Sequence, residues 1–420
     1  MIRQHVQSTS SWLALAALIV TSGSAAPLRA QSINAVYLES NIGSTPDMNS
    51  VFGFSNDGTG SLTALPNSPY LTGGTGIYKP GASSTALDAD HEVILVPAST
   101  TAAAYVLAVN GHSNTFTSFT VNSDGSLTEV SGTPISSNGQ DPASFGLAYD
   151  LFGGGTSWLP VINKNEDPLQ NMGNKDATNV SIFKLNAEGK PQLVTVGTID
   201  LTEGSSPSEI LETGGSTGHF AYLDTMLTTG TITAYKIRST GQLELVNSVN
   251  APSTGATIQG MVFNPTYRAI YAGLPSLSEV GVFGFNSSDS GVSFVKAVAN
   301  SGKNVGWLAV DSSGDYLYTA ESGSGTVTVY SLAHYLTPTE VQHYSLIKSS
   351  KGETPSAANL AFDPTGAFLY CLDSANSVLH VLTVDATTGE VSEPNAPTVL
   401  DVPTGEQALG LATGMVGSSN

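Results

Sequence analysis

A unit of short strands and tight turns recurs along this chain, and this repeat constrains the fold more than any other feature. The clearest copy runs from Ala358 to Glu393, and a second begins at Trp307. Each copy has an apolar strand, a turn such as D-P-T-G, a tyrosine-bearing strand, a loop and a Thr/Val-rich strand. The turn glycines supply the positive φ angles that tight hairpins need. One such unit buries little by itself, so neighbouring copies are expected to pack together.

The number of copies and their offset at the chain ends predict the architecture. The last candidate innermost strand, A-L-G-L-A-T-G, has no strands after it, while the segment I-N-A-V-Y-L-E-S near the start has none before it. The C-terminal strand can therefore complete the N-terminal unit and leave no open edge. We predict an all-β, seven-bladed β-propeller over residues 31–420; two stacked β-sandwiches are the alternative. The seven innermost strands are expected to start near Ser83, Ala143, Ser208, Gln259, Trp307, Ala358 and Ala408.

The repeats are longer than the roughly 40–45 residues of common propeller blades, so insertions are expected in loops. Two segments look like such insertions: His91–Thr101 within blade two and Lys164–Thr178 within blade three.

The first thirty residues are predicted to be a secretory signal rather than part of the fold. Arg3 and His5 precede an apolar stretch, and small residues follow, so cleavage is expected after Ala26 or Ala30. The apolar stretch is short for a membrane span. We therefore expect a secreted protein, located extracellularly, in a periplasm or at a cell surface.

Charge and cysteine content limit the partners. Residues 1–30 contain Arg3 and Arg29 and no acid, so their removal changes the net charge from −20 to −22. Such a charge repels phosphate backbones and anionic lipid surfaces, so we expect neither nucleic-acid binding nor membrane insertion. Cys371 is the only cysteine, which excludes an internal disulfide. We expect a monomer that needs no cofactor.

The repeats resemble those of the lactonase-type seven-bladed propellers, a family that includes 6-phosphogluconolactonases and carboxymuconate cyclases. The resemblance is strongest from Gly302 to Glu390, where P-S-A-A-N-L-A-F-D-P-T-G-A-F-L-Y matches the family's S-A-A and D-G-x-F-L-Y pattern. The segment Y-T-A-E, from Tyr318, resembles the family's Y-V-x-N-E. The resemblance implies that Glu321 is an acid–base group lining a cleft at one end of the central channel. Asn359, within the first motif, becomes a substrate-binding candidate.

Two departures from the family pattern change the expected substrate. Where the family begins one blade with G-P-R-H, this chain has N-V-G-W, ending at Trp307, and the family's S-N-R becomes L-D-S. The mature chain keeps only two arginines, Arg238 and Arg268, and neither is expected to point inward. Without arginine, bidentate capture of an anion is lost. The expected partner is therefore a small-molecule lactone or a carbohydrate, and a neutral or weakly charged lactone is favoured over a phosphorylated one.

Polar residues end most of the tyrosine-bearing strands and are expected on one face of the disc. As a functional site, this ring would bind a hard cation or a polyol, or supply an acid or base. As a structural feature, each residue would cap the following loop through local backbone N–H groups. Glu39, Asp224 and Asp373 are the candidates for a metal. The set comprises Glu39, Asn110, Asn163, Asp224, Glu321 and Asp373, with Gly273 in the fifth blade.

Three further residues are candidates for substrate binding. Lys303 is the nearest cation to an innermost strand, and Trp307 could stack against a sugar ring, although core packing is the alternative for it. His112 is expected on the same face as Glu321. No histidine pair has metal-ligand spacing, and no G-x-S-x-G elbow occurs. Two functions stay open: a lactone hydrolase or cycloisomerase, and a non-catalytic propeller that binds a glycan, a cell-wall polymer or a protein.

Overall fold

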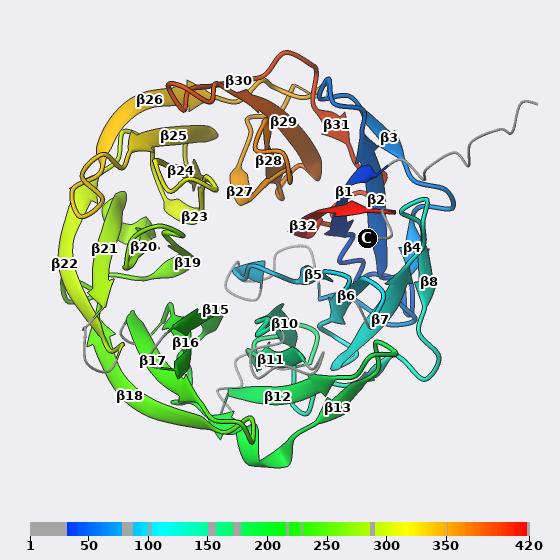
Figure 1. The fold of residues 1–420 in the computed structure, drawn as a ribbon. Coiled ribbons are helices and arrows are strands. Elements are labelled where there is room, and N and C mark those ends of the chain that lie inside the picture. Colours follow the sequence, from blue (N-terminus) through cyan, green and yellow to red (C-terminus); the bar gives the residue numbers. More distant parts are fainter. Residues whose placement is uncertain are drawn as a thin grey trace, which may run out of the picture.

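Seven antiparallel sheets surround a central axis in the computed structural model (Figure 1). The structure describes residues 32–77, 87–99, 102–149, 157–170, 178–215, 218–227, 230–285, 290–350 and 352–417. The predicted secretory signal lies outside this part of the chain. No described helix is long and apolar enough to cross a membrane. The seven-bladed β-propeller is thus confirmed.

Each blade has a channel-facing strand followed by strands that step outward, and the blades are numbered from the N-terminus. Blade one has β32 (Leu409–Val416), β1 (Ile33–Glu39), β2 (Ser50–Asn56) and β3 (Leu62–Ala64), with β4 (Tyr70–Leu71) paired to β2. Blade two has β5 (Val93–Val96), β6 (Tyr105–Asn110), β7 (Thr115–Val121) and β8 (Leu127–Glu129), with β9 (Ile135–Ser136) on β7. Blade three has β10 (Pro142–Phe145), β11 (Ser157–Asn163), β12 (Asn179–Leu185) and β13 (Pro191–Leu193), with β14 (Ile199–Asp200) on β12.

The remaining four blades follow the same order. Blade four has β15 (Pro207–Gly215), β16 (Gly218–Thr225), β17 (Thr231–Ile237) and β18 (Leu243–Asn250). Blade five has β19 (Gln259–Phe263), β20 (Ala269–Leu274), β21 (Glu279–Phe285) and β22 (Val292–Ala299). Blade six has β23 (Val305–Val310), β24 (Tyr316–Glu321), β25 (Thr326–Ser331) and β26 (Thr339–Ser345). Blade seven has β27 (Ala357–Phe362), β28 (Phe368–Asp373), β29 (Val378–Val384) and β30 (Val391–Ser392), with β31 (Thr398–Val399) on β29. Short 3₁₀ turns lie at Thr195–Gly197 and Pro275–Leu277.

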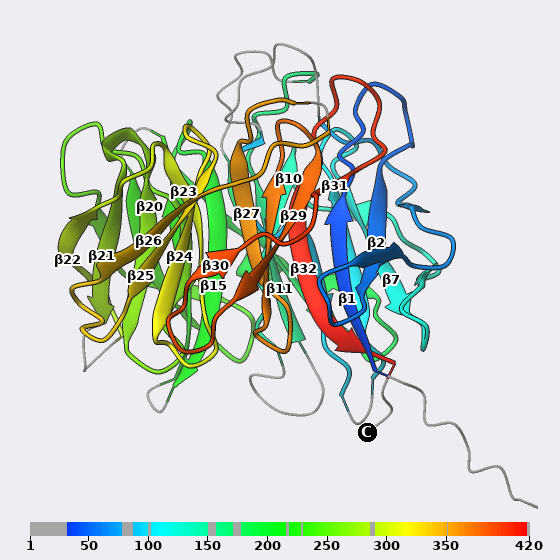
Figure 2. The same ribbon diagram turned by 90° about the horizontal axis from the view of Figure 1, so that it is seen from above.

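The C-terminal strand closes the ring as predicted. β32 pairs antiparallel with β1, from Ile33 opposite Val416 to Glu39 opposite Leu409. Figures 1 and 2 show β1 and β32 side by side in one blade. The expected starts of six innermost strands agree with the structure to within two residues.

Blade two differs from the prediction. Its innermost strand is β5, Val93–Val96, within the segment that was expected to be an insertion. The expected start at Ser83 lies outside the described residues. β5 is short and lacks the D-P-T-G type of turn after it, so the repeat pattern is weakest here. The predicted insertion in blade three is confirmed as the connection between β11 and β12.

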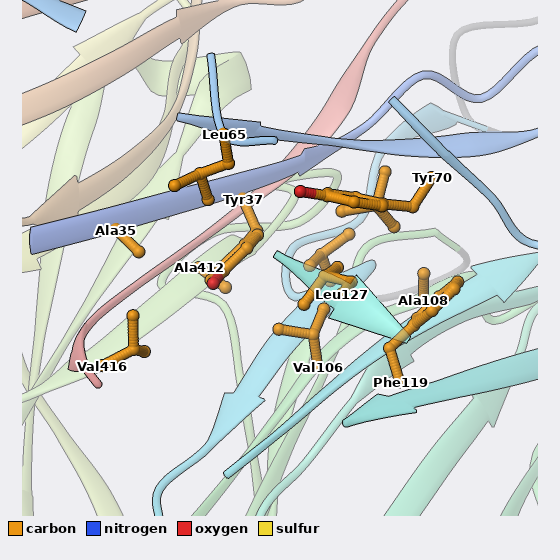
Figure 3. Close-up of a cluster of buried hydrophobic side chains, with 12 residues drawn as sticks. Ala35, Tyr37, Leu65, Tyr70, Val106, Ala108, Phe119, Leu127, Ala412 and Val416 are labelled. Carbon is orange, nitrogen blue, oxygen red and sulfur yellow. The ribbon is translucent and has the colours of Figure 1, made fainter. Parts of the chain in front are cut away.

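The hydrophobic core is divided among the interfaces between blades, because the sheet of each blade packs against a neighbouring blade on both of its faces. Figure 3 shows one seam, where Tyr37 and Ala412 of blade one meet Val106 and Phe119 of blade two. Inner strands are consequently buried on both sides, whereas the outermost strands alternate, as in β26. Burial on both faces explains why apolar and polar residues alternate clearly only in the outer strands.

The tyrosines of the second strands join most blades to the next, the exception being blade three, whose β11 contains no tyrosine. The hydroxyl of Tyr37 donates to the carbonyl of Gly125 at 2.7 Å, that of Tyr318 to Gly389 at 2.9 Å, and Tyr222 and Tyr271 make equivalent bonds. The acceptor is an outer-turn or loop carbonyl of the following blade in each case. A buried hydroxyl needs such a partner, so the repeated tyrosine fixes the spacing between blades.

Candidate functional site

The polar residues that end the second strands gather at one face, as predicted, but their side chains are buried. Glu39, Asn110, Asn163, Asp224, Glu321 and Asp373 are all at most 2% exposed. They bond to surrounding loops, some of their own blade and some of a neighbouring blade. The Nδ2 group of Asn49 donates to Asn110 and to Glu39, for example. The environment of these side chains therefore resembles the structural role considered above, in which they bond to nearby loops, more than an open binding site.

Glu321 lies inside this ring rather than at a cavity. Its carboxylate accepts hydrogen bonds from Asn300 at 3.0 Å, from Thr326 at 2.8 Å and from Thr319. A Cβ at Gly302 would lie 2.5 Å from its Cγ, so the backbone of a neighbouring loop covers the side chain. Glu321 is absent from the described lining of both axial cavities. Burial raises the pKa of its carboxyl to about 7, against the opposing effect of the hydroxyl and amide donors.

This environment gives Glu321 a measurable effect on stability. Because its folded pKa is about 7 and its unfolded value is near 4.5, the folded protein binds the extra proton, and stability falls as pH rises through this window. One pKa unit corresponds to about 1.4 kcal/mol, so the loss reaches about 3 kcal/mol by pH 8. Glu321→Gln should remove this loss. The free energies of unfolding of variant and wild type should diverge between pH 4.5 and pH 8 in urea titrations; parallel pH profiles would contradict this.

Two of the three metal candidates, Asp224 and Asp373, differ from each other in their hydrogen bonds. Asp224 accepts from Ser208 N at 3.2 Å and Oγ at 2.8 Å, and from the backbone N–H groups of Glu209 at 2.6 Å and Gly260 at 2.9 Å. Asp373 is bonded to Asn376 of its own loop. Glu39, Asp224 and Asp373 belong to blades one, four and seven. Among the described residues, the group close enough to share one ion is a different one: Asp90, His91 and Glu209.

Two cavities follow the axis. The first, here called the channel cavity, has a volume of about 510 Å³ and is lined by residues of all seven innermost strands. Most of its described wall is apolar, but Asp90, His91, Glu209 and Glu212 form a polar side. The Nδ1 atom of His91 lies 3.3 Å from Oε1 of Glu209. Burial raises the pKa of Glu209 well above its usual range.

The second, here called the mouth cavity, has a volume of about 440 Å³ and lies at the end where the innermost strands begin. Its described lining includes four amide side chains, five hydroxyls and a single carboxylate, and no lysine, arginine or histidine. The lining residues are Leu87, Asp88, Met226, Thr257, Gln259, Pro275, Ser276, Asn304, Trp307, Ser322, Ser356, Ala358, Asn359, Ser374, Ala375, Gln407 and Leu409.

The mouth cavity brings together two of the predicted substrate-binding residues. Trp307 lines it but is only 4% exposed, and a Cβ at Gly260 would lie 2.4 Å from its ring, so one ring face is covered. Asn359 forms part of the floor, and its Nδ2 donates to Oδ1 of Asp90 at 2.9 Å. The mouth cavity therefore meets the polar side of the channel cavity at this bond.

The other two predicted residues lie outside the described lining of the mouth cavity. Lys303 is exposed, and its backbone N–H donates to Ser324. The Nδ1 atom of His112 lies 2.8 Å from Oδ2 of Asp167, in a pair at the side of blade two. The structure does not bring Lys303 and His112 together with Trp307 and Asn359.

Asp88, which the sequence did not suggest, is the carboxylate of the mouth cavity. Its Oδ1 accepts from Nε2 of Gln259 at 3.0 Å, and its backbone carbonyl accepts from Nζ of Lys164 at 2.6 Å. Burial raises the pKa of its carboxyl, and the charge of Lys164 opposes this. Asp88 precedes blade two, while Gln259 starts blade five, so only the closed ring places them together. No spacing in the sequence signals this pair.

Fold and cavities define a seven-bladed propeller with two cavities along its axis. Residues 225–406 match the family model described as lactonase, 7-bladed beta-propeller. The resemblance to lactonase-type propellers seen in the repeats is confirmed over this part of the chain.

Solved structures share this fold at low sequence identity. A putative 6-phosphogluconolactonase from Bacteroides fragilis is 15% identical with a TM-score of 0.66, covering 93% of this chain and 100% of that one. The periplasmic gluconolactonase PpgL of Pseudomonas aeruginosa is 16% identical with a TM-score of 0.57, covering 74% and 83%. A Lactobacillus plantarum protein is 13% identical with a TM-score of 0.65, covering 91% and 99%. No curated protein is significantly similar in sequence.

Proposed function

We propose that this protein hydrolyses a neutral, polyhydroxylated lactone in the mouth cavity, after export from the cell. The lining of the mouth cavity carries this proposal. Amide and hydroxyl side chains surround it, and its described wall offers no cation to a phosphate or carboxylate. Such side chains suit the hydroxyl groups of a sugar-like ring, because each can donate or accept a hydrogen bond.

The size and state of the lining also suit this substrate class. A volume of about 440 Å³ fits a single small ring with its hydroxyl groups. The hydroxyl of Ser374 is buried and has no hydrogen-bond partner among the described residues, so it is ready to bond to a ligand. Trp307 contributes an apolar edge rather than a stacking face.

Asp88 is the general base of the proposed reaction. Its carboxylate accepts a proton from a water molecule whose oxygen attacks the lactone carbonyl. The ring C–O bond then breaks, and the leaving alkoxide receives that proton from Asp88, so the product is the open hydroxy acid. Gln259 holds the carboxylate through its amide, and Lys164 holds the backbone of the same residue.

Similar proteins support the reaction class. The structurally similar Pseudomonas aeruginosa protein is a periplasmic gluconolactonase, and a gluconolactone carries no phosphate. The predicted secretory signal at residues 1–30 agrees with export of this chain.

Kinetics with a panel of neutral sugar lactones test the assignment of the base. Asp88→Asn keeps the oxygen that Gln259 contacts but removes the base, so kcat/KM should fall by about 100-fold or more. Glu321→Gln is the matched control, because it replaces a buried carboxyl outside the cavity, and its kcat should stay within about twofold of wild type. Unchanged kcat/KM in Asp88→Asn, or a selective loss in Glu321→Gln, would overturn the assignment.

The same cavity also favours a second function, retention of a sugar-containing polymer without turnover. Neutral amide and hydroxyl groups bind glycans as well as lactones. Binding of sugar ligands that Ser374→Ala weakens, with no hydrolysis of any lactone in the panel, would favour this second function.

A further inference from the structure

Asp90, His91 and Glu209 form a compact group on the wall of the channel cavity. One ligand atom from each residue lies within 4.8 Å of the others. Asp90 and His91 lie just before β5 of blade two, whereas Glu209 is on β15 of blade four, so the group spans two blades that are not neighbours. All three residues line the channel cavity, which gives the group an open side.

Surrounding groups hold one oxygen of each of the two carboxylates. Oδ1 of Asp90 accepts from His91 N at 2.8 Å and from Asn359 at 2.9 Å. Oε2 of Glu209 accepts from the backbone of Met261, which leaves Oε1 beside His91. This arrangement is that of metal ligands oriented by a second layer of hydrogen bonds.

The distance within the group suits a shared ion better than a direct hydrogen bond. Nδ1 of His91 and Oε1 of Glu209 are 3.3 Å apart, longer than the 2.8 Å of the His112–Asp167 pair. Two ligand atoms bound tetrahedrally to zinc are about 3.4 Å from each other. The separation already present between these two atoms therefore matches that of a zinc site.

The charge of the region points to a cation as well. Asp90 and Glu209 are at most 7% exposed, and among the described residues His91 is the only ionic partner of Glu209. Glu92, two positions from Asp90, is 2% exposed, and neither of its carboxylate oxygens bonds to another described residue. Buried carboxylates are normally paired or coordinate metals, and the described lining of the channel cavity contains no lysine or arginine.

We propose that Asp90, His91 and Glu209 bind one divalent first-row metal ion, with Zn²⁺ as the reference ion. One imidazole and two carboxylates are ligands that zinc accepts, and calcium and magnesium prefer oxygen ligands alone. Three protein ligands leave a fourth position that opens to the channel cavity. This site goes beyond the proposed lactone hydrolysis, because metal binding is measured without any lactone.

Isothermal titration of the chelator-treated mature chain with ZnCl₂ tests the site. Wild type should bind one Zn²⁺ per chain, and Glu209→Gln should weaken binding at least 30-fold. His91→Asn should do the same; asparagine suits that position, because the φ of His91 is 63° and asparagine tolerates this left-handed region. His112→Asn is the matched control, since its side chain is 35% exposed against 33% for His91 and also faces a carboxylate.

The pattern among the variants decides the proposal. Equal losses in His91→Asn and His112→Asn, unchanged binding in Glu209→Gln, or no stoichiometric binding by wild type would overturn it. Thermal melting identifies any variant that fails to fold. If a variant does not fold, the NMR spectrum of wild type loaded with Co²⁺ is measured instead. One paramagnetically shifted imidazole signal would support the site, and the absence of any such signal would contradict it. The result of the zinc titration does not depend on whether the metal-free protein hydrolyses a lactone. Failure of the metal site and failure of the proposed hydrolysis can therefore be told apart.

Discussion

A chain ending at Gln407 should fail to fold into a cooperative domain. Removal of residues 408–420 deletes β32, which supplies the channel-facing strand of blade one. The loss includes five buried apolar side chains, Ala408, Leu409, Leu411, Ala412 and Val416. Burial of each larger one contributes about 1.5–3 kcal/mol, and exposed edges of β1 and of the seam with blade two add to the cost. The sum approaches the entire stability of about 5–15 kcal/mol that single domains have.

Calorimetry and gel filtration measure this effect. The truncated chain should show no cooperative melting transition and should aggregate, whereas a control chain ending at Gly417 keeps β32 and should melt as the full-length protein does. A cooperative transition of the truncated chain within a few degrees of wild type would show that closure of blade one is dispensable.

Asp224→Ala should be the most destabilising substitution in the ring of polar strand ends. Three backbone or hydroxyl donors of blade four and the backbone N–H of Gly260 in blade five lose their acceptor. Each buried donor left unsatisfied costs about 1–3 kcal/mol, so the free energy of unfolding should fall by about 4 kcal/mol. The cost is large because this one carboxylate joins the innermost strands of two blades.

Asp373→Ala is the comparison, because it changes the same position of another blade. Its carboxylate accepts from the backbone and the side chain of Asn376 and interacts with the backbone of Ser356, all within blade seven, so a smaller loss of about 2 kcal/mol is expected. Urea denaturation of both variants gives the two values. Equal losses would mean that the link from Asp224 to blade five carries no extra stability.

The sequence predicted the architecture well because most blades repeat the same local pattern. Turn glycines, the second-strand tyrosine and the offset chain ends are all local features, and six of the innermost strands begin where expected. Blade two was misread at Ser83 because β5 has only four residues and no sharp turn after it. The count of seven was nevertheless correct, since one apolar strand per blade lines the channel.

The site was less predictable, because closure of the ring creates it. Glu321 was correctly expected at one end of the disc, but its side chain faces the loop of Asn300 rather than the axis. The direction of a side chain at a strand end depends on register and on the bulges that several innermost strands contain, as at Val305/Leu308. Asp88 and Gln259, or His91 and Glu209, are distant in sequence and carry no shared motif, so spacing alone could not pair them.

A charge comparison on one sugar lactone tests the central claim most directly. The described wall of the mouth cavity offers amides, hydroxyls and the carboxylate of Asp88, and a phosphate would enter it without a counter-charge. The measurement is kcat/KM for a neutral sugar lactone and for its phosphorylated counterpart under identical conditions. We expect the neutral lactone to be preferred by at least about tenfold, equivalent to about 1.4 kcal/mol. Preference for the phosphorylated lactone would contradict this account of the mouth cavity.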